Sequence, residues 1–333
     1  MARRTVRQVC RDLISIKSLD CRTAFNSVIL TGRDSKRIAT AAGIDTPIRG
    51  ESKMIRSILI GLDDTDASRH AQELAISLAQ TLGAHIAAAC VVNVPQLTAP
   101  EPVPPGAAHF KHEKDEALIA RAETEARGML HAFAKTCLQA GIGHDMALVH
   151  GDPVEELTKA APLHDLIVLG RDTSFEQDRG EGSREMSRPS LQLVRAAPRP
   201  VLIATAKAPG KGPDVVAYDG SLPAMRALQL YCLLGLGKDR ETRILSIGQD
   251  EDAVRATAET GTRFAAMHGV KAITHAIVSK DDPAAVLRVE AHGGAARLLV
   301  MGAYGRRGWR ELILGSCTSE LLAKSETALF VYH

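Results

Sequence analysis

The sequence predicts an α/β protein of two tandem, doubly wound parallel sheets, each with five strands and with helices on both faces. Two observations lead to this prediction. From Met54 onward, short apolar or β-branched runs alternate with Ala- and Leu-rich stretches of helical character. The same order of segments then occurs a second time. Strands that alternate with helices are typical of parallel sheets covered on both sides.

The first copy is expected to hold five strands separated by helices. A helix over 71–82 follows the first strand, a long helix over 115–140 precedes the third, and Asp152-Pro153 opens another. Prolines crowd between residues 95 and 105, which predicts an exposed loop. The expected strands are 58–60, 86–94, 146–150, 165–169 and 200–204.

The second copy repeats the first after a linker rich in Pro, Gly and Lys. Residues 214–221 (DVVAYDGS) match residues 57–64, and residues 297–302 (RLLVMG) match residues 165–170. Such a repeat indicates internal duplication of one α/β unit. The expected boundaries are 54–206 for the first domain, 207–213 for the linker and 214–333 for the second domain.

Residues 1–53 differ from the rest of the chain. They contain more than twice as many Lys and Arg as Asp and Glu and have weak periodicity, so we expect a basic, disordered extension. Three interpretations stay open: a transit peptide, a basic interaction arm, or upstream sequence translated because the start codon was set too early. Met54 stands directly before the first expected strand, which favours the third.

The composition excludes several classes of protein. A net charge of +2 and 3% aromatic residues leave little for binding nucleic-acid backbones or stacking on bases. The six cysteines form no CxxC pair, so we expect reduced thiols rather than a zinc site or a disulfide framework. There is no apolar run of about 18 residues and no secretory signal. We therefore expect a soluble, cytoplasmic protein without nucleic-acid or membrane partners.

One stretch of the second copy, residues 301–316 (MGAYGRRGWRELILGS), joins its fourth strand to the next helix. The spacing is Gly302-x2-Gly305-x9-Gly315-Ser316. Glycine lets a backbone approach a ligand closely, and N–H groups at a helix start attract anions. The stretch lacks the GxxxxGK[ST] pattern and the intervals of a dinucleotide fingerprint. On spacing alone, a phosphate site and a mobile connecting loop both stay open.

This spacing, combined with Asp219 at the end of the first strand of the second copy, resembles the ATP-binding type of the universal stress protein family. The resemblance covers residues 55–333 and identifies a tandem member. It implies an adenine nucleotide alpha hydrolase-like, Rossmann-like fold, with an adenine nucleotide beyond the ends of the first and fourth strands. It also implies that the domains pair through their fifth strands as a pseudo-dimer, whereas a homodimer of the whole chain stays open.

The resemblance also implies roles for single positions of the second copy. Residues at the end of the first strand would lie along the adenosine, with Asp219 on a polar edge of the base or ribose, and Ile247 would pack on the base. Glycines and hydroxyls after the fourth strand would surround the triphosphate. Tyr218 and Cys317 depart from the family pattern, which has smaller and β-branched residues there. The expected binding residues are Ala217, Tyr218, Asp219, Ile247, Met301, Gly302, Gly305, Gly315, Ser316, Cys317 and Thr318.

Alternative roles stay open for two groups of side chains near this motif. Asp219 precedes Gly-Ser, a context that is also typical of a turn or helix cap. Arg306, Arg307 and Arg310 would either meet phosphate charge or form a solvated run. They are not counted among the binding residues.

The first copy departs from the motif. It keeps a carboxylate at the end of its first strand and Gly170, but Thr173 stands where the second glycine is expected. Alignment of the last strands places Ser187-Arg188 opposite Gly315-Ser316. A side chain at the position of close approach would crowd a phosphate. We therefore expect altered or lost nucleotide binding in the first domain and one nucleotide per chain.

The sequence thus predicts a stress-response or signalling module that binds ATP, with or without Mg²⁺, in its second domain. No HExxH or GxSxG motif indicates an enzyme. Two alternatives stay open. One is a slow ATPase, for which no residue stands out as the base; the other is a scaffold that makes contacts through the basic extension or the proline-rich loop. The preference among ATP, ADP and cyclic AMP also stays open.

Overall fold

The computed structural model describes most of the chain beyond the basic extension. The described residues fall within one compact unit that runs from Lys53 to His333. The extension expected over 1–53, and its expected disorder, lie outside the described residues. The described residues are 55–102, 104, 108–173, 175, 186–303 and 315–333.

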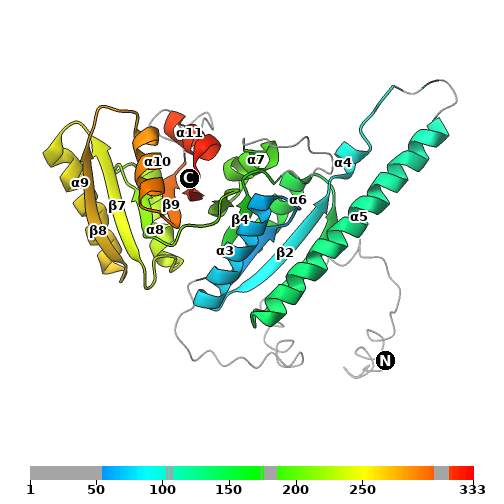
Figure 1. The fold of residues 1–333 in the computed structure, drawn as a ribbon, viewed down its shortest axis with the longest axis horizontal. Helices are drawn as coiled ribbons and strands as arrows, with labels where there is room; N and C mark the ends of the chain where they lie inside the picture. The colour runs from blue at the N-terminus through cyan, green and yellow to red at the C-terminus, as the bar shows by residue number, and fades with distance from the viewer. Residues whose placement is uncertain (1–54, 103, 105–107, 174, 176–185, 304–314) are drawn as a thin grey trace, which may run out of the picture. The chain divides into compact units, whose positions relative to one another are not determined.

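The first domain alternates strands and helices as the sequence predicts (Figure 1). Its strands pair in parallel throughout. Its elements are β1 (Ser57–Gly61), α3 (Asp66–Leu82), β2 (His85–Val92), α4 (Val94–Leu97), α5 (Ala108–Gln139), β3 (His144–His150), α6 (Pro153–Ala160), the 3₁₀ turn η1 (Ala161–Leu163), β4 (Leu166–Gly170), α7 (Arg188–Ala196) and β5 (Val201–Ala204).

The second domain repeats this order, again with parallel pairing among its five strands. Its elements are β6 (Asp214–Ala217), α8 (Leu222–Leu233), β7 (Glu241–Gly248), α9 (Glu251–Met267), β8 (Lys271–Val278), α10 (Pro283–Gly293), β9 (Leu298–Gly302), α11 (Ser316–Lys324) and β10 (Ala328–Tyr332).

The two five-stranded sheets join edge to edge into one sheet of ten strands, in the order β3-β2-β1-β4-β5-β10-β9-β6-β7-β8. The joint is the antiparallel pairing of β5 with β10, in which Leu202 lies opposite Phe330. The pairing expected between the fifth strands is therefore present. In each domain the first strand lies between the second and the fourth, and the crevice beyond this switch point is where open α/β sheets bind ligands.

Both faces of the sheet are buried. Along β1, Ile58 and Ile60 belong to the core on one face, whereas Leu59 belongs to the core on the other. Strands with apolar side chains on both faces need helices on both sides. The doubly wound arrangement predicted from the sequence follows from this requirement.

Three features of the helices differ from the prediction: the starts of two helices and the presence of one additional helix. The helix α3 starts at Asp66 rather than at residue 71, because the Thr65 side chain accepts a hydrogen bond from the backbone N–H of Ser68 and caps its first turn. The loop expected over 95–105 contains the short helix α4, whose first turn is capped by Asn93. The third is the start of α5.

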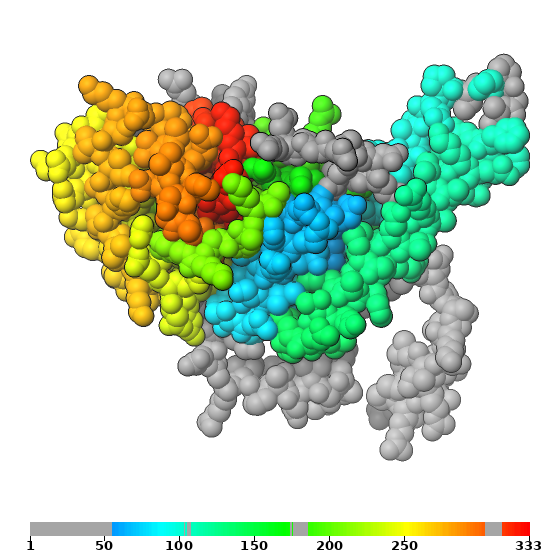
Figure 2. Space-filling view, viewed as in Figure 1, coloured from blue at the N-terminus to red at the C-terminus, as the bar shows by residue number. Residues whose placement is uncertain are grey.

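The helix α5 begins at Ala108, seven residues before the predicted start at 115. Its buried side chains occur only from Ala122 onward. The polar N-terminal half extends beyond the sheet, as Figures 1 and 2 show. This half has no buried apolar stripe, so the periodicity that signals a packed helix is missing there.

One first-domain side chain contacts the last helix of the second domain. Arg171 follows β4 and donates hydrogen bonds to the carbonyl oxygens of Ala323 (3.3 Å) and Ser325 (2.7 Å), at the C-terminus of α11. A cation at this end of a helix interacts favourably with its dipole. Among the described helices, none combines the length and the apolar character that crossing a bilayer requires.

Candidate functional site

A cavity of about 330 Å³ lies beyond the C-terminal ends of β6, β7 and β9, between the starts of α8, α10 and α11. Most of the residues predicted to bind a nucleotide line it, which follows from the topology, since parallel strands end at one edge of the sheet. These lining residues are Ala217, Tyr218, Asp219, Ile247, Met301, Gly302, Cys317 and Thr318.

The remaining predicted residues lie beside the cavity or outside the described residues. Gly315 is the N-cap of α11 and Ser316 is its first residue, next to Cys317 in the lining. Gly305 lies outside the described residues, as do the three arginines that the sequence leaves open. Ser221, Pro223, Leu245 and Leu287, which the sequence did not single out, also line the cavity.

A second, adjoining cavity of about 260 Å³ lies between β7 and α9. Asp219 and Ile247 line both cavities. The second domain therefore has space on both sides of these two residues. Together the two spaces suit an elongated ligand with two chemically different ends.

The Asp219 carboxylate acts in the local turn as well as in the cavity wall. Its Oδ1 accepts a hydrogen bond from the backbone N–H of Ser221 at 2.9 Å, and Ser221 is itself the N-cap of α8. Asp219 therefore caps a turn through its Oδ1 atom, as one of the two interpretations of the sequence expects. The same atom pattern occurs at Asp63, whose Oδ1 accepts from the backbone N–H of Thr65 at 3.1 Å.

The ring of Tyr218 is buried against α9, which explains the departure from the family pattern. A Cβ atom added at Gly261 would come within 3.0 Å of Tyr218 Cδ1 and 2.8 Å of Ile244 Cγ2. In the first domain the corresponding residues are Leu62 and Phe133, both buried. The aromatic ring is on the helix in the first domain (Phe133) and at the strand end in the second (Tyr218). Gly261, in the middle of α9, leaves space for the Tyr218 ring. Burial raises the pKa of the Tyr218 hydroxyl.

The start of α11 has no side-chain cap from the described residues. Its N-cap, Gly315, has φ −58° and ψ 152°, a conformation that any residue adopts, and no side chain among the described residues caps the first turn. Ser, Thr, Asp or Asn at an N-cap usually stabilises a helix by about 1 kcal/mol over Ala. Glycine as N-cap offers the first N–H groups of the helix no side-chain acceptor, an arrangement that favours an anion as their partner.

Acidic groups surround the thiol of Cys317 beside this helix start. Burial, followed by the charges of Asp282, Glu320 and Asp219, raises the pKa of Cys317 to about 11. The thiol is therefore neutral at physiological pH. Thr318 Oγ1 lies 3.5 Å from the carbonyl oxygen of Gly302, to which it donates a long hydrogen bond.

Gly302 also has a structural role that the sequence did not indicate. A Cβ atom there would lie 2.4 Å from the carbonyl carbon of Pro223 and 2.6 Å from the backbone nitrogen of Ala224. The first turn of α8 thus packs directly on the end of β9. Gly170 has the same role in the first domain, where an added Cβ would lie 2.6 Å from the backbone nitrogen of Ser68.

Comparison with known proteins agrees with this geometry. The family model described as the universal stress protein family matches residues 54–205 and again residues 215–333. The chain belongs to the universal stress protein family. The double match confirms the tandem arrangement predicted from the sequence.

One sequence relative bears the same family name, and two solved structures share the fold. The chain is 25% identical over 293 residues to a universal stress protein of Synechocystis sp., a match that covers 84% of this chain and 100% of the relative. A universal stress protein structure from Archaeoglobus fulgidus superposes with a TM-score of 0.60 at 20% identity, covering 84% of this chain and 98% of that one. A functionally unknown protein of Pseudomonas aeruginosa has a TM-score of 0.53 at 17% identity, with coverages of 85% and 94%.

In the first universal stress protein domain, a side chain caps the helix α7, whereas the corresponding helix of the second domain, α11, has no side-chain cap. Ser187 is the N-cap of α7, at the position of Gly315, and its Oγ accepts a hydrogen bond from the backbone N–H of Ser190 at 3.2 Å. Ser187 Oγ also donates to the carbonyl oxygen of Thr173. The first turn of α7 therefore already has an acceptor from its own chain.

Phe175 fills the first-domain counterpart of the larger cavity, a feature that the sequence analysis missed. A Cβ atom added at Gly61 would lie 3.0 Å from Phe175 Cζ, 3.3 Å from Leu157 Cδ1 and 2.7 Å from Leu169 Cδ2. Phe175 is 8% exposed and has a positive φ of 57°, which is unusual for a bulky residue.

The corresponding residues of the second domain are Ala217, Leu287 and Met301, which line its cavity. In the first domain, an aromatic ring of the chain itself occupies this space. The sequence signal for the difference is small: a glycine at position 61 where the second domain has alanine.

The described residues offer no ready-made metal site. Within them, no group of three or more His, Cys, Asp or Glu side chains is arranged to hold an ion. The four described cysteines, Cys90, Cys137, Cys232 and Cys317, are free thiols.

Proposed function

We propose that the second domain binds an adenine nucleotide, ATP, and that the protein acts in the cytoplasm as a nucleotide-dependent stress-response or signalling module. The observation that supports this most is the start of α11, where Gly315 leaves the first N–H groups uncapped beside a cavity at the sheet's switch point. A helix start of this kind favours phosphate.

The two adjoining cavities suit the parts of such a ligand. Ile247 gives an apolar surface for the base, and Asp219, which lines both cavities, offers an acceptor for a base or ribose donor. The larger cavity leads to Gly315 and Ser316, which would meet the phosphates. Burial of the base among apolar side chains supplies affinity, and the few polar groups orient the ligand.

The charges around the cavity indicate a role for Mg²⁺. Asp219, Asp282 and Glu320 lie near Cys317, and no Lys or Arg is among the described residues that line either cavity. A triphosphate next to these carboxylates is better accommodated with a divalent cation. Mg²⁺ is commonly held by phosphates and water with one or two carboxylates, so the site needs no cluster of protein ligands.

The experiment is a thermal-shift measurement with Mg²⁺-ATP on the full chain and on Gly315→Asp. Aspartate is a good N-cap, so the variant should fold at least as well as the parent, while its carboxylate occupies the N–H groups and repels phosphate. We expect ATP to raise the Tm of the parent, by an amount equivalent to about 2.7 kcal/mol at a concentration of 100 Kd. The variant should show no ATP-dependent rise.

The matched control is Ser187→Asp, the same change at the corresponding N-cap of the first domain. It should keep the full response to ATP. An equal response of the parent and Gly315→Asp would contradict the proposed site. Phosphate release from ATP by the parent, above the rate of Gly315→Asp, would favour the slow-ATPase alternative over binding alone.

A further inference from the structure

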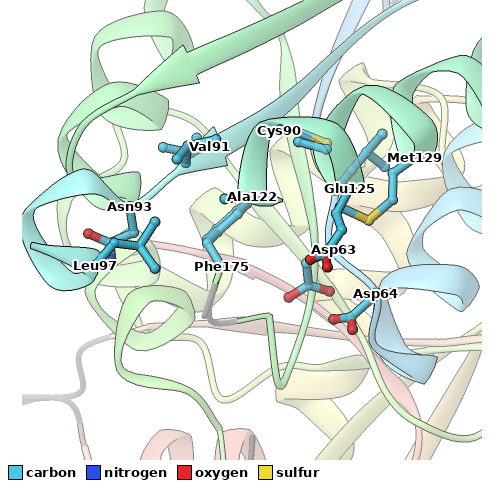
Figure 3. A pocket seen from close by; sticks show the side chains of 13 residues that line it. Asp63, Asp64, Cys90, Val91, Asn93, Leu97, Ala122, Glu125, Met129 and Phe175 are labelled. Carbon is cyan, nitrogen blue, oxygen red and sulfur yellow. The ribbon is translucent and has the colours of Figure 1, made fainter. Parts of the chain in front are cut away.

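The first domain keeps a cavity of its own, of about 330 Å³, although Phe175 fills the counterpart of the larger second-domain cavity. It lies between the end of β2, the helix α4 and the long helix α5, and Figure 3 shows the side chains that line it. It corresponds to the smaller cavity of the second domain, between β7 and α9.

The correspondence rests on matching hydrogen bonds. The backbone N–H of Leu62 donates to the carbonyl oxygen of Ala89 as that of Tyr218 donates to Leu245, each at 2.9 Å. At the ends of the long helices, Ile142 bonds back to Cys137 as Val270 does to Ala265. These bonds align the residues of the two cavities position by position.

The base of the first-domain cavity is the more apolar of the two. The second domain has Ser246, Gly248 and Thr257 in its lining. The corresponding residues of the first domain are Cys90, Val92 and Met129. Each change replaces a hydroxyl or a hydrogen atom with thiol, aliphatic or thioether surface. Burial, followed by the charge of Asp63, raises the pKa of Cys90 to about 12, so this thiol stays neutral.

The helix α4 adds a wall that the second domain does not have. There, β7 is followed after two residues by α9, whereas β2 is followed by α4 and by the polar N-terminal half of α5. Leu97, the last residue of α4, lines the cavity, and in Figure 3 it lies at one end of the cavity with Met129 at the other. The segment inserted in the first domain therefore gives the cavity one more apolar side.

The three carboxylates in the lining already interact with other groups of the chain. Asp63 Oδ1 accepts hydrogen bonds from the backbone N–H of Thr65 at 3.1 Å and from its hydroxyl at 2.7 Å. Glu125 accepts from Arg121 Nε at 2.8 Å, and Asp64 also interacts within the chain. A charged ligand would lose its hydration and would have to displace one of these partners.

The amide of Asn93 is engaged in the same way. Its Oδ1 accepts from the backbone N–H of Gln96 at 3.3 Å, and its Nδ2 donates to Gln96 Oε1 at 2.9 Å. Both contacts hold the first turn of α4. The polar side chains of the lining thus build the cavity, and its apolar surface is what it offers to a ligand.

We propose that the first domain binds an uncharged apolar ring compound in this cavity, against Val92, Met129 and Phe175. Removal of apolar surface from water drives such binding. A volume of about 330 Å³ lies within the range of small-ligand sites and admits a molecule of one or two rings. The protein would then bind a different ligand in each domain, and this second site does not depend on the proposed nucleotide site.

The test uses tryptophol, which is uncharged, and two probes of the same ring system, tryptamine and indole-3-propionate, which carry an ammonium and a carboxylate. Binding to the full chain is measured by isothermal titration calorimetry with and without saturating Mg²⁺-ATP. We expect tryptophol to bind at one site per chain and both charged probes to bind at least about tenfold more weakly. Saturating ATP should leave tryptophol binding unchanged.

Two variants and a matched control locate the site. Ala126 lines the cavity, so Ala126→Leu places a larger side chain in it and should weaken tryptophol binding at least about tenfold. Leu97→Ala shortens the wall that α4 supplies and should weaken binding about threefold or more without affecting the rest of the fold. Leu138→Ala is the control, because Leu138 is 70% exposed on α5 outside the lining, and it should bind tryptophol like the parent.

The response to ATP separates this proposal from the proposed function. All three variants should keep the ATP-dependent rise in Tm of the parent. Tryptophol binding by a parent that does not respond to ATP would contradict the nucleotide site alone. An ATP response without tryptophol binding would contradict the ring-compound site alone.

Other results would also overturn the proposal. Binding of tryptamine as tight as that of tryptophol, or tighter, would mean that the lining selects a cation. Displacement of tryptophol by ATP would place the ligand in the second domain. Unchanged tryptophol binding in both Ala126→Leu and Leu97→Ala would place it outside this cavity.

Discussion

The two domains share one fold and differ at the start of their last helices. In the second domain, α11 starts at Gly315 without a side-chain cap; in the first, Ser187 caps α7 from the corresponding position. Phe175 adds a second difference, because its ring fills space that is open in the second domain. Under the proposed function, loss of the phosphate site in the first domain needs no change in the fold. Among the described residues, the Ser187 hydroxyl and the Phe175 ring are the differences that would account for it.

Features that both domains share indicate packing rather than ligand binding. Gly170 and Gly302 both end the fourth strand, and each lets a helix pack directly on it. A glycine that is present in both domains, including the one with a closed helix start, serves packing. Gly315, which the first domain lacks, is the better indicator of a phosphate site.

The largest expected effect comes from Gly302→Ala and Gly170→Ala. In both, the new Cβ meets backbone atoms at 2.4–2.6 Å, which cannot move without displacing a helix. We expect each to lower the free energy of unfolding by about 4 kcal/mol or more, measured by urea denaturation. Gly128→Ala is the control, because nothing lies within 4 Å of its added Cβ, and it should stabilise α5 by up to about 1 kcal/mol. A small loss of unfolding free energy for Gly170→Ala, with a large loss for Gly302→Ala, would mean that the ends of β4 and β9 are not packed alike.

The exchanged aromatic positions can be tested by swapping them. We expect Gly261→Phe to destabilise the second domain by about 3 kcal/mol, because the Tyr218 ring already fills that space. The double variant Tyr218→Leu/Gly261→Phe copies the first-domain pair of Leu62 and Phe133 and should recover most of the loss. A double-mutant cycle from urea unfolding measures the coupling. Additive effects would show that the two positions do not share one space.

The Phe175 ring is tested by Phe175→Ala. Removing it leaves a void next to Gly61 and Leu169, and we expect a loss of about 2 kcal/mol, less than the roughly 3–5 kcal/mol of a central core position. Phe110→Ala is the control, because that ring is 71% exposed and its loss should have little effect. Equal effects of the two substitutions in urea unfolding would mean that Phe175 does not fill the first-domain site.

The smallest effect is a pH dependence from a position at which only the first domain has a histidine. Burial lowers the pKa of His164 below its usual value of 6.5, against the opposing charge of Asp165, and the second domain has Ala296 at this position. The folded protein therefore favours neutral His164. Its stabilising contribution is complete above pH 6.5 and is lost as the pH falls below that value. The His164→Gln variant should lose less stability than the parent between pH 7.5 and 5.5, measured by urea unfolding; identical losses would contradict this assignment.

Much of the fold could be predicted from the sequence. The strands are short apolar runs bounded by turn residues, so their positions were predicted to within a few residues. The start of α5 could not be predicted, because its N-terminal half buries nothing and has no apolar periodicity. The helix α4 was missed because four residues leave too short a pattern.

The positions of the candidate site residues could be predicted from the sequence where they follow from the strand topology alone. Asp219, Ile247 and Met301 end neighbouring parallel strands, so they lie at one edge of the sheet whatever their side chains do. The positions of Phe175 and of the Tyr218 ring depend on which side chain fills a given space, and residues far apart in the sequence decide this. The binding roles of the predicted residues stay a prediction.

The pairing of β5 with β10 has a consequence for symmetry. A homodimer joined through these strands would be two-fold symmetric, and any substitution would change both of its sites alike. Here the two halves are joined covalently, so each evolves under its own constraints while the interface stays that of a pair. The chain is in effect a heterodimer whose subunits cannot dissociate. Every chain therefore has one capped helix start, at Ser187, and one without a side-chain cap, at Gly315, whatever the protein concentration.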